Sequence, residues 1–286
     1  MPKAAPAAGA GPRRAEAGPR RGRGGAPRQP IASTGVAYWV LKIILTPVLH
    51  VFYRVRVEGR EHIPGEGPVV IACNHVSFCD SVFLPLVLRR RITFVAKAEY
   101  FEDRRTAWFF RAVGQIPIVR GGGSDSERAL VSARAVLDGG GVFGIYPEGT
   151  RSPDGRLYKG HTGVARLALQ CHAPVVCAAL CGTREAQPIG ARLPRPFSAI
   201  RVRFGPPLRP DELAAGPDDP LALRRITDEI MWRIGELSGQ EYVDTYAKRG
   251  GSEGPGAAVA APVVRIPLTE PVPPPSPAEP AGVGAS

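Results

Sequence analysis

The sequence lacks several patterns that would place it in a common class of protein. Its five cysteines include no C-x-x-C pair, so their spacing does not support a structural zinc site. Five cysteines cannot all pair, and three stand in apolar segments, which predicts reduced, buried thiols in a cytoplasmic setting. The chain also has no G-x-x-x-x-G-K-[ST] loop, which argues against a nucleotide-hydrolysing P-loop protein.

Acidic residues are outnumbered, and the formal net charge of +11 with a pI near 9.9 favours anionic partners. Nucleic acid, phosphorylated substrates and acidic lipid all fit this charge. The sequence has no aromatic and basic recognition module, and residues 1–30 alone hold seven basic residues against one acidic residue. A basic nucleic-acid-binding protein is therefore a remote alternative, and we expect no nucleic-acid partner.

Both ends of the chain have too few apolar side chains to offset the entropy of ordering. We expect a disordered basic leader over residues 1–30 and a disordered Pro/Ala/Gly-rich tail over residues 246–286. Between them we expect a membrane-associated helical segment, residues 31–56, followed by an α/β domain, residues 57–245.

The apolar stretch "VAYWVLKIILTPVLHVFY", residues 36–53, is the one membrane candidate. As a helix it would be about 27 Å long, just short of a hydrocarbon core of about 30 Å, and Lys42, Pro47 and His50 interrupt it. A long leader and the lack of a small-residue cleavage site argue against a cleaved signal peptide. Aromatic pairs at both ends suit the headgroup level. We predict a shallow or re-entrant anchor, with a full span and a buried core helix as the alternatives.

Apolar, strand-like runs alternate with amphipathic, helical patterns in the middle of the chain. The strand-like runs are residues 68–72, 92–96, 115–119, 141–146, 174–180 and 200–204. The helical patterns include residues 124–138, where Ser124 and Glu127 have the spacing of a capping box. This alternation predicts an α/β fold with a mixed, largely parallel sheet flanked by helices. In such sheets, functional sites lie beyond the carboxyl ends of strands.

The first polar cluster, "CNHVSFCDS" at residues 73–81, follows the strand-like run "PVVIA". Neutral imidazole can take a proton from an alcohol, and a carboxylate bonded to its other nitrogen fixes the tautomer. His75 and Asp80, in H-x4-D spacing, are therefore candidates for a base and its orienting acid, with the alcohol supplied by a substrate. The spacing alone is a weak signal. The plain alternative is that Asp80 caps the next helix while His75 lines a turn.

Three further polar groups follow strand-like runs. The turn "YPEGTRS", residues 146–152, offers backbone N–H groups and a cation to a phosphate or a developing oxyanion. Arg120 ends "GQIPIVR" beside a Gly-rich helix entry, where an arginine can meet a phosphate. Lys97 ends another run. Each feature alone has a plain alternative, which is an ordinary turn or a solvated charge.

Together these motifs resemble the bacterial glycerolipid acyltransferase family, which includes 1-acyl-sn-glycerol-3-phosphate acyltransferases. They occur in the order H-x4-D, strand-Lys, G-x-I-x-I-x-R, P-E-G-T-R and "APVVCAAL", over about residues 50–210. The pairing of "NHVSFCD" with "YPEGTRS" about seventy positions later is specific. Tyr146 stands where the family usually has Phe, and "APVVC" replaces its V-P-V-x-P block, which bears on acyl-chain preference.

The resemblance implies transfer of a fatty acyl group from a thioester, acyl-CoA or acyl-ACP, to the sn-2 hydroxyl of 1-acyl-glycerol 3-phosphate, giving phosphatidic acid. His75 would act as the base and Asp80 as its partner. Glu148 and Gly149 are assigned to oxyanion stabilisation or acceptor positioning. The candidates for binding the phosphate are Arg120, Arg151, Lys97 and Thr150.

The implied chemistry requires no metal and no bound cofactor beyond the acyl thioester co-substrate. The expected partners are lysophosphatidic acid, acyl-CoA or acyl carrier protein, and an anionic membrane surface. We expect a peripheral or re-entrant protein on the cytoplasmic face of the plasma membrane. The alternatives are an acyltransferase of the same fold acting on glycerol 3-phosphate or another lysolipid, and a hydrolase in which water replaces the alcohol.

Overall fold

The computed structural model describes residues 35–102, 107–108, 110–111, 113–118, 123–191, 193–214 and 216–248. The predicted leader lies outside these ranges, and so do nearly all of the predicted tail and Arg120. Within the described ranges, the side chains of Lys97 and Ser124 are not described. The predicted capping box at Ser124 therefore stays a prediction.

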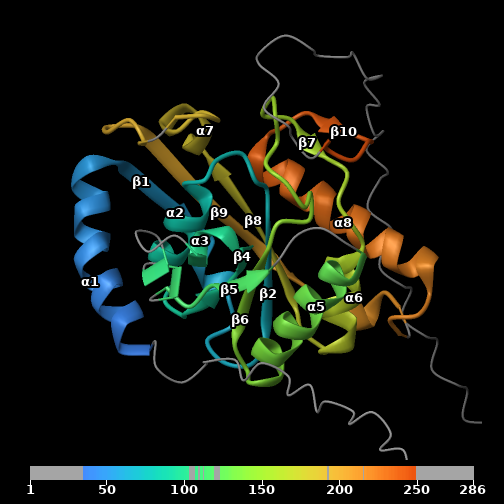
Figure 1. Cartoon of the computed structure of the whole chain (residues 1–286). Helices are drawn as coiled ribbons and strands as arrows, with labels where there is room; N and C mark the ends of the chain where they lie inside the picture. Colours follow the sequence, from blue (N-terminus) through green and yellow to red (C-terminus); the bar gives the residue numbers. More distant parts are fainter. Residues whose placement is uncertain are drawn as a thin grey trace, which may run out of the picture. The chain divides into compact units, whose positions relative to one another are not determined.

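A six-stranded mixed sheet forms the centre of the fold, in the order β1-β9-β8-β2-β6-β3 (Figure 1). Neighbouring strands are parallel except for the antiparallel pair β8–β9. The predicted α/β fold with a largely parallel, mixed sheet is confirmed. The strands of this sheet are β1 (Arg54–Glu58), β2 (Val69–Cys73), β3 (Ile92–Thr93), β6 (Val142–Ile145), β8 (Val175–Cys181) and β9 (Ala199–Leu208).

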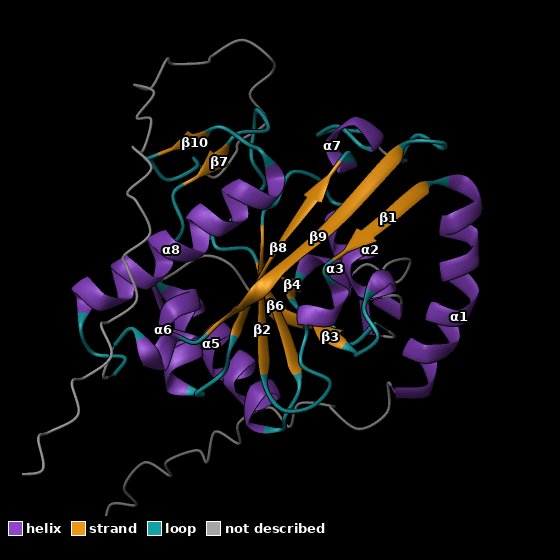
Figure 2. Cartoon of the chain, turned by 180° about the vertical axis from the view of Figure 1, so that it is seen from behind, coloured by secondary structure: helices purple, strands orange, loops and turns teal. Residues whose placement is uncertain are grey.

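Helices cover both faces of the sheet, and Figures 1 and 2 show them as separate groups. One face carries α5 (Gly123–Asp138), α6 (Gly163–Gln170) and α8 (Pro220–Ser238), and the other carries α2 (Asp80–Val87). The central strand β2 is buried along its whole length because both of its faces are covered. Val70 and Ala72 join the core beneath α5, α6 and α8, whereas Ile71 and Cys73 join the core beneath α2.

Shorter elements complete the fold. Two small parallel ribbons pair β4 (Val95–Lys97) with β5 (Ile116–Ile118), and β7 (Leu157–Tyr158) with β10 (Tyr242–Val243). The remaining short elements are η1 (Arg60–His62), α3 (Glu99–Glu102), α7 (Thr183–Ala186) and η2 (Pro210–Glu212).

Two features of the strands differ from the prediction. The run at residues 92–96 is split between β3 in the main sheet and β4 in a ribbon, with Phe94 between them. The edge strand β1 was not predicted, because arginine alternates with valine there and its burial pattern leaves one face in solvent. The predicted boundary between residues 56 and 57 falls inside β1.

The N-terminal helix α1 (Gly35–Phe52) packs lengthwise against α2 (Figure 1). The Tyr38 hydroxyl donates to the carbonyl of Pro85 at 3.4 Å, and the Lys42 ammonium donates to the carbonyls of Pro85 and Leu88 at the end of α2. Tyr38 is the single buried residue of α1, so the alternative of a buried core helix is wrong. By length and composition alone, α1 could cross a membrane. Its exposed large apolar residues are Val36, Trp39, Val40, Ile43, Ile44, Val48, Val51 and Phe52.

Candidate active site

Polar loops meet at one end of the main sheet, because the parallel strands β2, β6 and β8 end there. They are residues 74–79 after β2, residues 146–152 after β6 and residues 182–187 after β8. The loop after β2 carries His75, and the loop after β6 carries the P-E-G-T-R sequence. Hydrogen bonds join all three loops. The first and second of these segments lie about seventy positions apart in the chain, and the second and third about thirty-five.

The imidazole of His75 lies against Asp80, with Nδ1 at 3.0 Å from Oδ2. The side chain of His75 is 16% exposed and that of Asp80 is fully buried. Because a carboxylate accepts, this contact assigns the ring proton to Nδ1 and leaves Nε2 as the basic nitrogen. The structure therefore brings together the predicted base and its orienting acid.

Asp80 also organises the backbone of the loop that carries His75. Its Oδ2 accepts hydrogen bonds from the N–H groups of Val76 and Ser77, each at 2.8 Å. These donors precede α2, and the N–H of the cap residue Cys79 donates to Ser77 Oγ at 3.3 Å, so Asp80 is not a side-chain cap for α2. One oxygen thus fixes both the ring and the loop, which excludes the plain reading of the H-x4-D spacing.

Glu148 holds the same loop from the other side. Its Oε2 accepts from the N–H of His75 and its Oε1 accepts from the N–H of Tyr158, each at 3.0 Å. The residue is 1% exposed, and burial raises the pKa of its carboxyl to about 7 although the two backbone hydrogen bonds lower it. Each oxygen accepts one backbone hydrogen bond, and the predicted role of Glu148 at an oxyanion or acceptor stays a prediction. Glu148 positions the backbone of His75.

Gly149 makes the turn that follows, and its predicted role in positioning the acceptor stays a prediction. Its φ of +71° is in the left-handed region, and an added Cβ would lie 3.0 Å from the ring of His161. Its N–H already donates to the carbonyl of Tyr146 at 3.0 Å, so it is not free for an oxyanion. By contrast, the N–H groups of Thr150 and Arg151 have no hydrogen-bond partner among the described residues.

The ring of His75 is stacked on Tyr146, with centroids 4.0 Å apart and planes 11° apart. Phe94 stacks on the other side of Tyr146 at 5.4 Å, and Gly144 makes room for it because a Cβ there would lie 2.2 Å from the Phe94 ring. The Tyr146 hydroxyl bonds Ser81 Oγ at 3.0 Å. Burial raises the pKa of the Tyr146 phenol well above its usual value, so the stacked ring stays neutral. This stack restricts the plane of the imidazole.

Several supporting residues were missed from the sequence. Asn74 bonds the backbone of Leu180 through both its amide oxygen, at 2.8 Å, and its amide nitrogen, at 3.0 Å, which ties the ends of β2 and β8 together. The Arg184 guanidinium donates to the carbonyls of Ser152 and Pro153 and supports the P-E-G-T-R turn. An asparagine directly before the H-x4-D motif was the available signal, whereas nothing local marks Arg184.

The structure describes some of the predicted phosphate ligands fully and others only in part or not at all. Arg151 is exposed and next to Ser152, whose N–H donates to the carbonyl of His75 at 2.7 Å. Thr150 is half-buried beside it. Lys97 ends β4, which pairs with β5 in register with Ile118. Arg120 lies outside the described residues, so its role stays a prediction.

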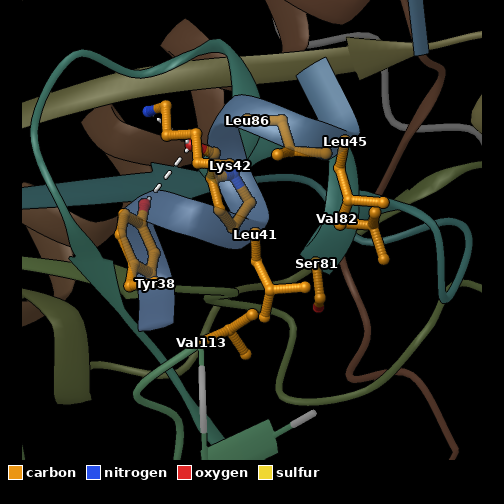
Figure 3. Close-up of a pocket in the computed structure, with 9 residues that line it drawn as sticks. Tyr38, Leu41, Lys42, Leu45, Ser81, Val82, Leu86 and Val113 are labelled. Atoms are coloured by element: carbon orange, nitrogen blue, oxygen red, sulfur yellow. Dashed lines mark hydrogen bonds between the residues drawn. The ribbon is translucent and has the colours of Figure 1, made fainter. Parts of the chain in front are cut away.

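An apolar pocket lies between α1 and α2 (Figure 3). Leu41 and Leu45 of α1 face Val82 and Leu86 of α2, and Val113 closes one side. Ser81 lies at the rim of this pocket and bonds Tyr146, which in turn stacks on His75. A single hydrogen bond and one ring stack therefore connect an apolar pocket to the candidate base.

The thiols match their prediction. All five cysteines are free, and Cys73, Cys79 and Cys177 are buried. Burial raises the pKa of Cys79 to about 11 and of Cys177 to about 12. Among the described residues, no three His, Cys, Asp or Glu side chains gather as a metal site.

Comparison with known proteins finds similarity to acyltransferases. Residues 54–180 match the family model described as Acyltransferase. The chain is 27% identical over 188 residues to 1-acyl-sn-glycerol-3-phosphate acyltransferase of Bacillus subtilis, covering 65% of this chain and 89% of that protein. It is 28% identical over 222 residues to the human alpha form, covering 74% of this chain and 76% of that protein.

Plant acyltransferases and a solved acyltransferase structure are also similar to this chain. The chloroplastic 1-acyl-sn-glycerol-3-phosphate acyltransferase LPAT1 of Arabidopsis thaliana is 28% identical over 172 residues, which are 60% of this chain and 48% of that protein. The chain thus spans about half the length of such plant relatives. The crystal structure of the 1-acyl-sn-glycerophosphate acyltransferase PlsC from Thermotoga maritima matches with a TM-score of 0.54 and 25% identity, over 70% of this chain and 78% of that chain. Over residues 54–180 the chain is thus similar to the Acyltransferase family.

Proposed function

We propose that this protein transfers a fatty acyl group from an acyl thioester to the sn-2 hydroxyl of 1-acyl-glycerol 3-phosphate, giving phosphatidic acid. The observation that carries the proposal is the contact of His75 Nδ1 with the buried Asp80, in a loop bonded to the P-E-G-T-R turn. The curated relatives named above, which carry the name 1-acyl-sn-glycerol-3-phosphate acyltransferase, support this acceptor.

His75 performs the proton transfer in this reaction. Its Nε2 removes the proton of the lipid hydroxyl as that oxygen attacks the thioester carbonyl. Asp80 stabilises the imidazolium that forms, in the manner of a triad whose nucleophile belongs to the substrate. The tetrahedral intermediate then expels the thiolate, which takes the proton from the imidazolium. Charge and protons balance without any group other than His75 and the two substrates.

Two parts of the P-E-G-T-R turn can bind the negative charges in the reaction, which are the oxyanion and the acceptor phosphate. The N–H groups of Thr150 and Arg151 are available to the oxyanion, a role that Gly149 cannot take because its N–H is bonded within the turn. The exposed guanidinium of Arg151 is suited to the acceptor phosphate, because arginine can bind phosphate through two parallel hydrogen bonds. Lys97, the last residue of β4, and Arg120 are further candidates for this phosphate.

The position of α1 supports a protein that lies in the membrane interface. Tyr38 and Lys42 bond α2, and Leu49 near the other end of α1 packs on the core, so one side of the helix is held by the domain. A full span would draw that polar domain into the bilayer. We infer peripheral seating on the cytoplasmic face, with the apolar side of α1 in lipid.

An acceptor panel with the full chain and His75→Ala tests the proposal. The full chain should acylate lysophosphatidic acid in preference to glycerol 3-phosphate, other lysolipids and water, with acyl-CoA and acyl-ACP compared as donors. His75→Ala should reduce transfer to background while its thermal unfolding stays like that of the parent. Substantial residual transfer would remove His75 as the base. Fatty acid release that ignores the acceptor concentration would favour a hydrolase.

A further inference from the structure

Large apolar side chains are exposed in the connection between α7 and β9. This connection, residues 187–198, is called the α7–β9 loop, and all of it except residue 192 is described. Leu193 is 80% exposed, Phe197 is 67% exposed and Ile189 is 50% exposed. The loop follows the carboxyl end of β8, and α7 lies at the same end of the sheet as the upper end of α1 (Figure 1). Three such side chains in a short loop form a small apolar surface.

Phe197 adopts an unfavourable backbone conformation in order to hold this place. Its φ is +63°, in the left-handed region that bulky residues rarely adopt. Two contacts maintain it, because its N–H donates to the carbonyl of Phe52 at 2.6 Å and its carbonyl accepts from the Arg54 guanidinium at 3.4 Å. The exposed ring gains little from burial in return. The ring is therefore available to a partner outside the chain.

The α7–β9 loop extends the apolar surface of α1. The ring of Phe197 lies 6.3 Å from that of Phe52, which ends α1 and is itself 45% exposed. Exposed arginines border this contact, namely Arg54 at the start of β1 and Arg195 within the loop. An apolar surface with aromatic rings and adjacent cations fits the headgroup region of an anionic bilayer.

The other end of the α7–β9 loop is bonded to the loop that carries His75. The Ser77 hydroxyl donates to the carbonyl of Gln187 at 2.9 Å, and the Cys79 thiol donates to its Oε1 at 3.0 Å. The amide nitrogen of Gln187 donates in turn to the carbonyl of Ala191 at 3.2 Å. Gln187 takes part in all three hydrogen bonds, as the acceptor in two and the donor in one, and it is 7% exposed. The apolar surface and the candidate site therefore form one connected unit.

We propose that the α7–β9 loop is a second membrane-contacting element, which places Leu193 and Phe197 in the headgroup region of an anionic bilayer beside the end of α1. Because Gln187 bonds the H-x4-D loop, this contact sets the height of His75 above the lipid surface. The membrane contact itself is independent of the reaction. Its consequence for catalysis rests on the proposed acyl transfer to a lipid hydroxyl.

Tryptophan fluorescence of the full chain tests the membrane contact without any assay of activity. Phe197→Trp should shift its emission to the blue on addition of phosphatidylcholine–phosphatidylglycerol vesicles, and brominated acyl chains should quench the added signal. The matched control is Leu221→Trp, at a residue 77% exposed at the start of α8, on the opposite side of the sheet from α1 and α2. Equal quenching of the two variants, or no quenching of Trp at position 197, would overturn the proposal.

A double variant tests the contribution to binding. Leu193→Asn with Phe197→Asn should weaken binding to the same vesicles by about tenfold or more, since each lost apolar contact is worth up to about tenfold. Asparagine tolerates positive φ, so the thermal unfolding midpoint should hold or rise slightly, whereas a damaged fold would lower it. Wild-type binding by this variant would refute the proposal.

Kinetics separate this inference from the proposed function. Toward a short-chain lysophosphatidic acid dissolved as monomer, the double variant should match the parent, and toward the same headgroup in vesicles it should be slower. Equal loss on both acceptors would place the effect in the fold and contradict a membrane role. If the parent acylates neither acceptor, the proposed function fails while the fluorescence result still decides the membrane contact.

Discussion

A buried acid follows each of the strands β2 and β6, but the two acids act on different parts of His75. Asp80, the first residue of α2, bonds the imidazole and the amides of the preceding loop, whereas Glu148 reaches from the loop after β6 to the N–H of His75. The first arrangement is local and sets the orientation and charge of the ring. The second joins two loops and sets the place of the backbone. Residues that control chemistry and residues that control position can thus be separated by substitution.

The largest effect is expected from Asp80→Asn. A single oxygen of Asp80 makes all three hydrogen bonds, so an asparagine can retain them through its amide oxygen while losing the negative charge. Acyl transfer should fall by about 10²–10⁴-fold because the imidazolium is no longer stabilised. Steady-state rates measure this loss, and circular dichroism and thermal unfolding should remain near those of the parent. A folded variant with near-normal turnover would remove the distinction between the two acids.

Arg151→Ala should raise the acceptor KM by about tenfold or more, because a charge-assisted hydrogen bond is worth about 1.5–3 kcal/mol. Arg156→Ala is the matched control, since its guanidinium is engaged by Asp154 at 2.7 Å. Kinetics with lysophosphatidic acid and with a monoacylglycerol that lacks phosphate make the comparison. Only the phosphorylated acceptor should respond. An effect on kcat alone would move Arg151 to stabilisation of the transition state.

Glu148→Gln tests the acid that positions the backbone. Burial raises the folded pKa of Glu148 from 4.5 to about 7, so the folded chain keeps a proton that the unfolded chain releases. The free energy of unfolding should therefore decrease as pH rises from about 4.5 to 7, by up to about 3 kcal/mol, and level off above that. The glutamine variant cannot titrate and should lose this part of the slope in urea unfolding. Identical slopes in the two proteins would show that Glu148 is not the titrating group.

The smallest effect is expected from Tyr146→Phe. The stack on His75 survives, and only the hydrogen bond to Ser81 is lost. Stability should decrease by about 0.5–1.5 kcal/mol, while turnover should change by less than about threefold. Ser81→Ala is the control, because in a double-mutant cycle the two losses should not add. A large decrease in kcat for Tyr146→Phe would indicate that the phenol takes part in proton transfer.

Sequence reasoning succeeded where the relevant contacts are local. The H-x4-D spacing predicted the meeting of His75 and Asp80, and strand periodicity predicted β2, β6 and β8. It failed where the partners are distant in the chain. Glu148 meets His75 across 73 positions, and Gln187 meets Ser77 across 110, so neither contact leaves a local pattern. Such contacts depend on the strand order, which local patterns do not encode.

The local residue pattern also gave a wrong prediction of strands at two places. The edge strand β1 was not predicted because of its arginines. Its alternation of arginine and valine indicates a strand only if one face is in solvent. At residues 92–96 one continuous apolar run predicted one strand, whereas Phe94 leaves the sheet to pack over Gly144. In that position Phe94 stacks on Tyr146, which in turn stacks on His75. The P-E-G-T-R motif marked the right loop, but it did not reveal that Glu148 points inward and only Arg151 outward.

A single residue, Tyr53, separates the end of α1 from the start of β1. It is 8% exposed, and its ring meets that of Phe83 edge-on at 5.2 Å, so this joint is stiff. Because only Tyr53 connects them, α1 cannot rotate independently of the main sheet. Any tilt that lipid thickness or curvature gives to the helix would turn the whole sheet by the same angle, and the membrane's mechanical state would thereby reach the reaction centre.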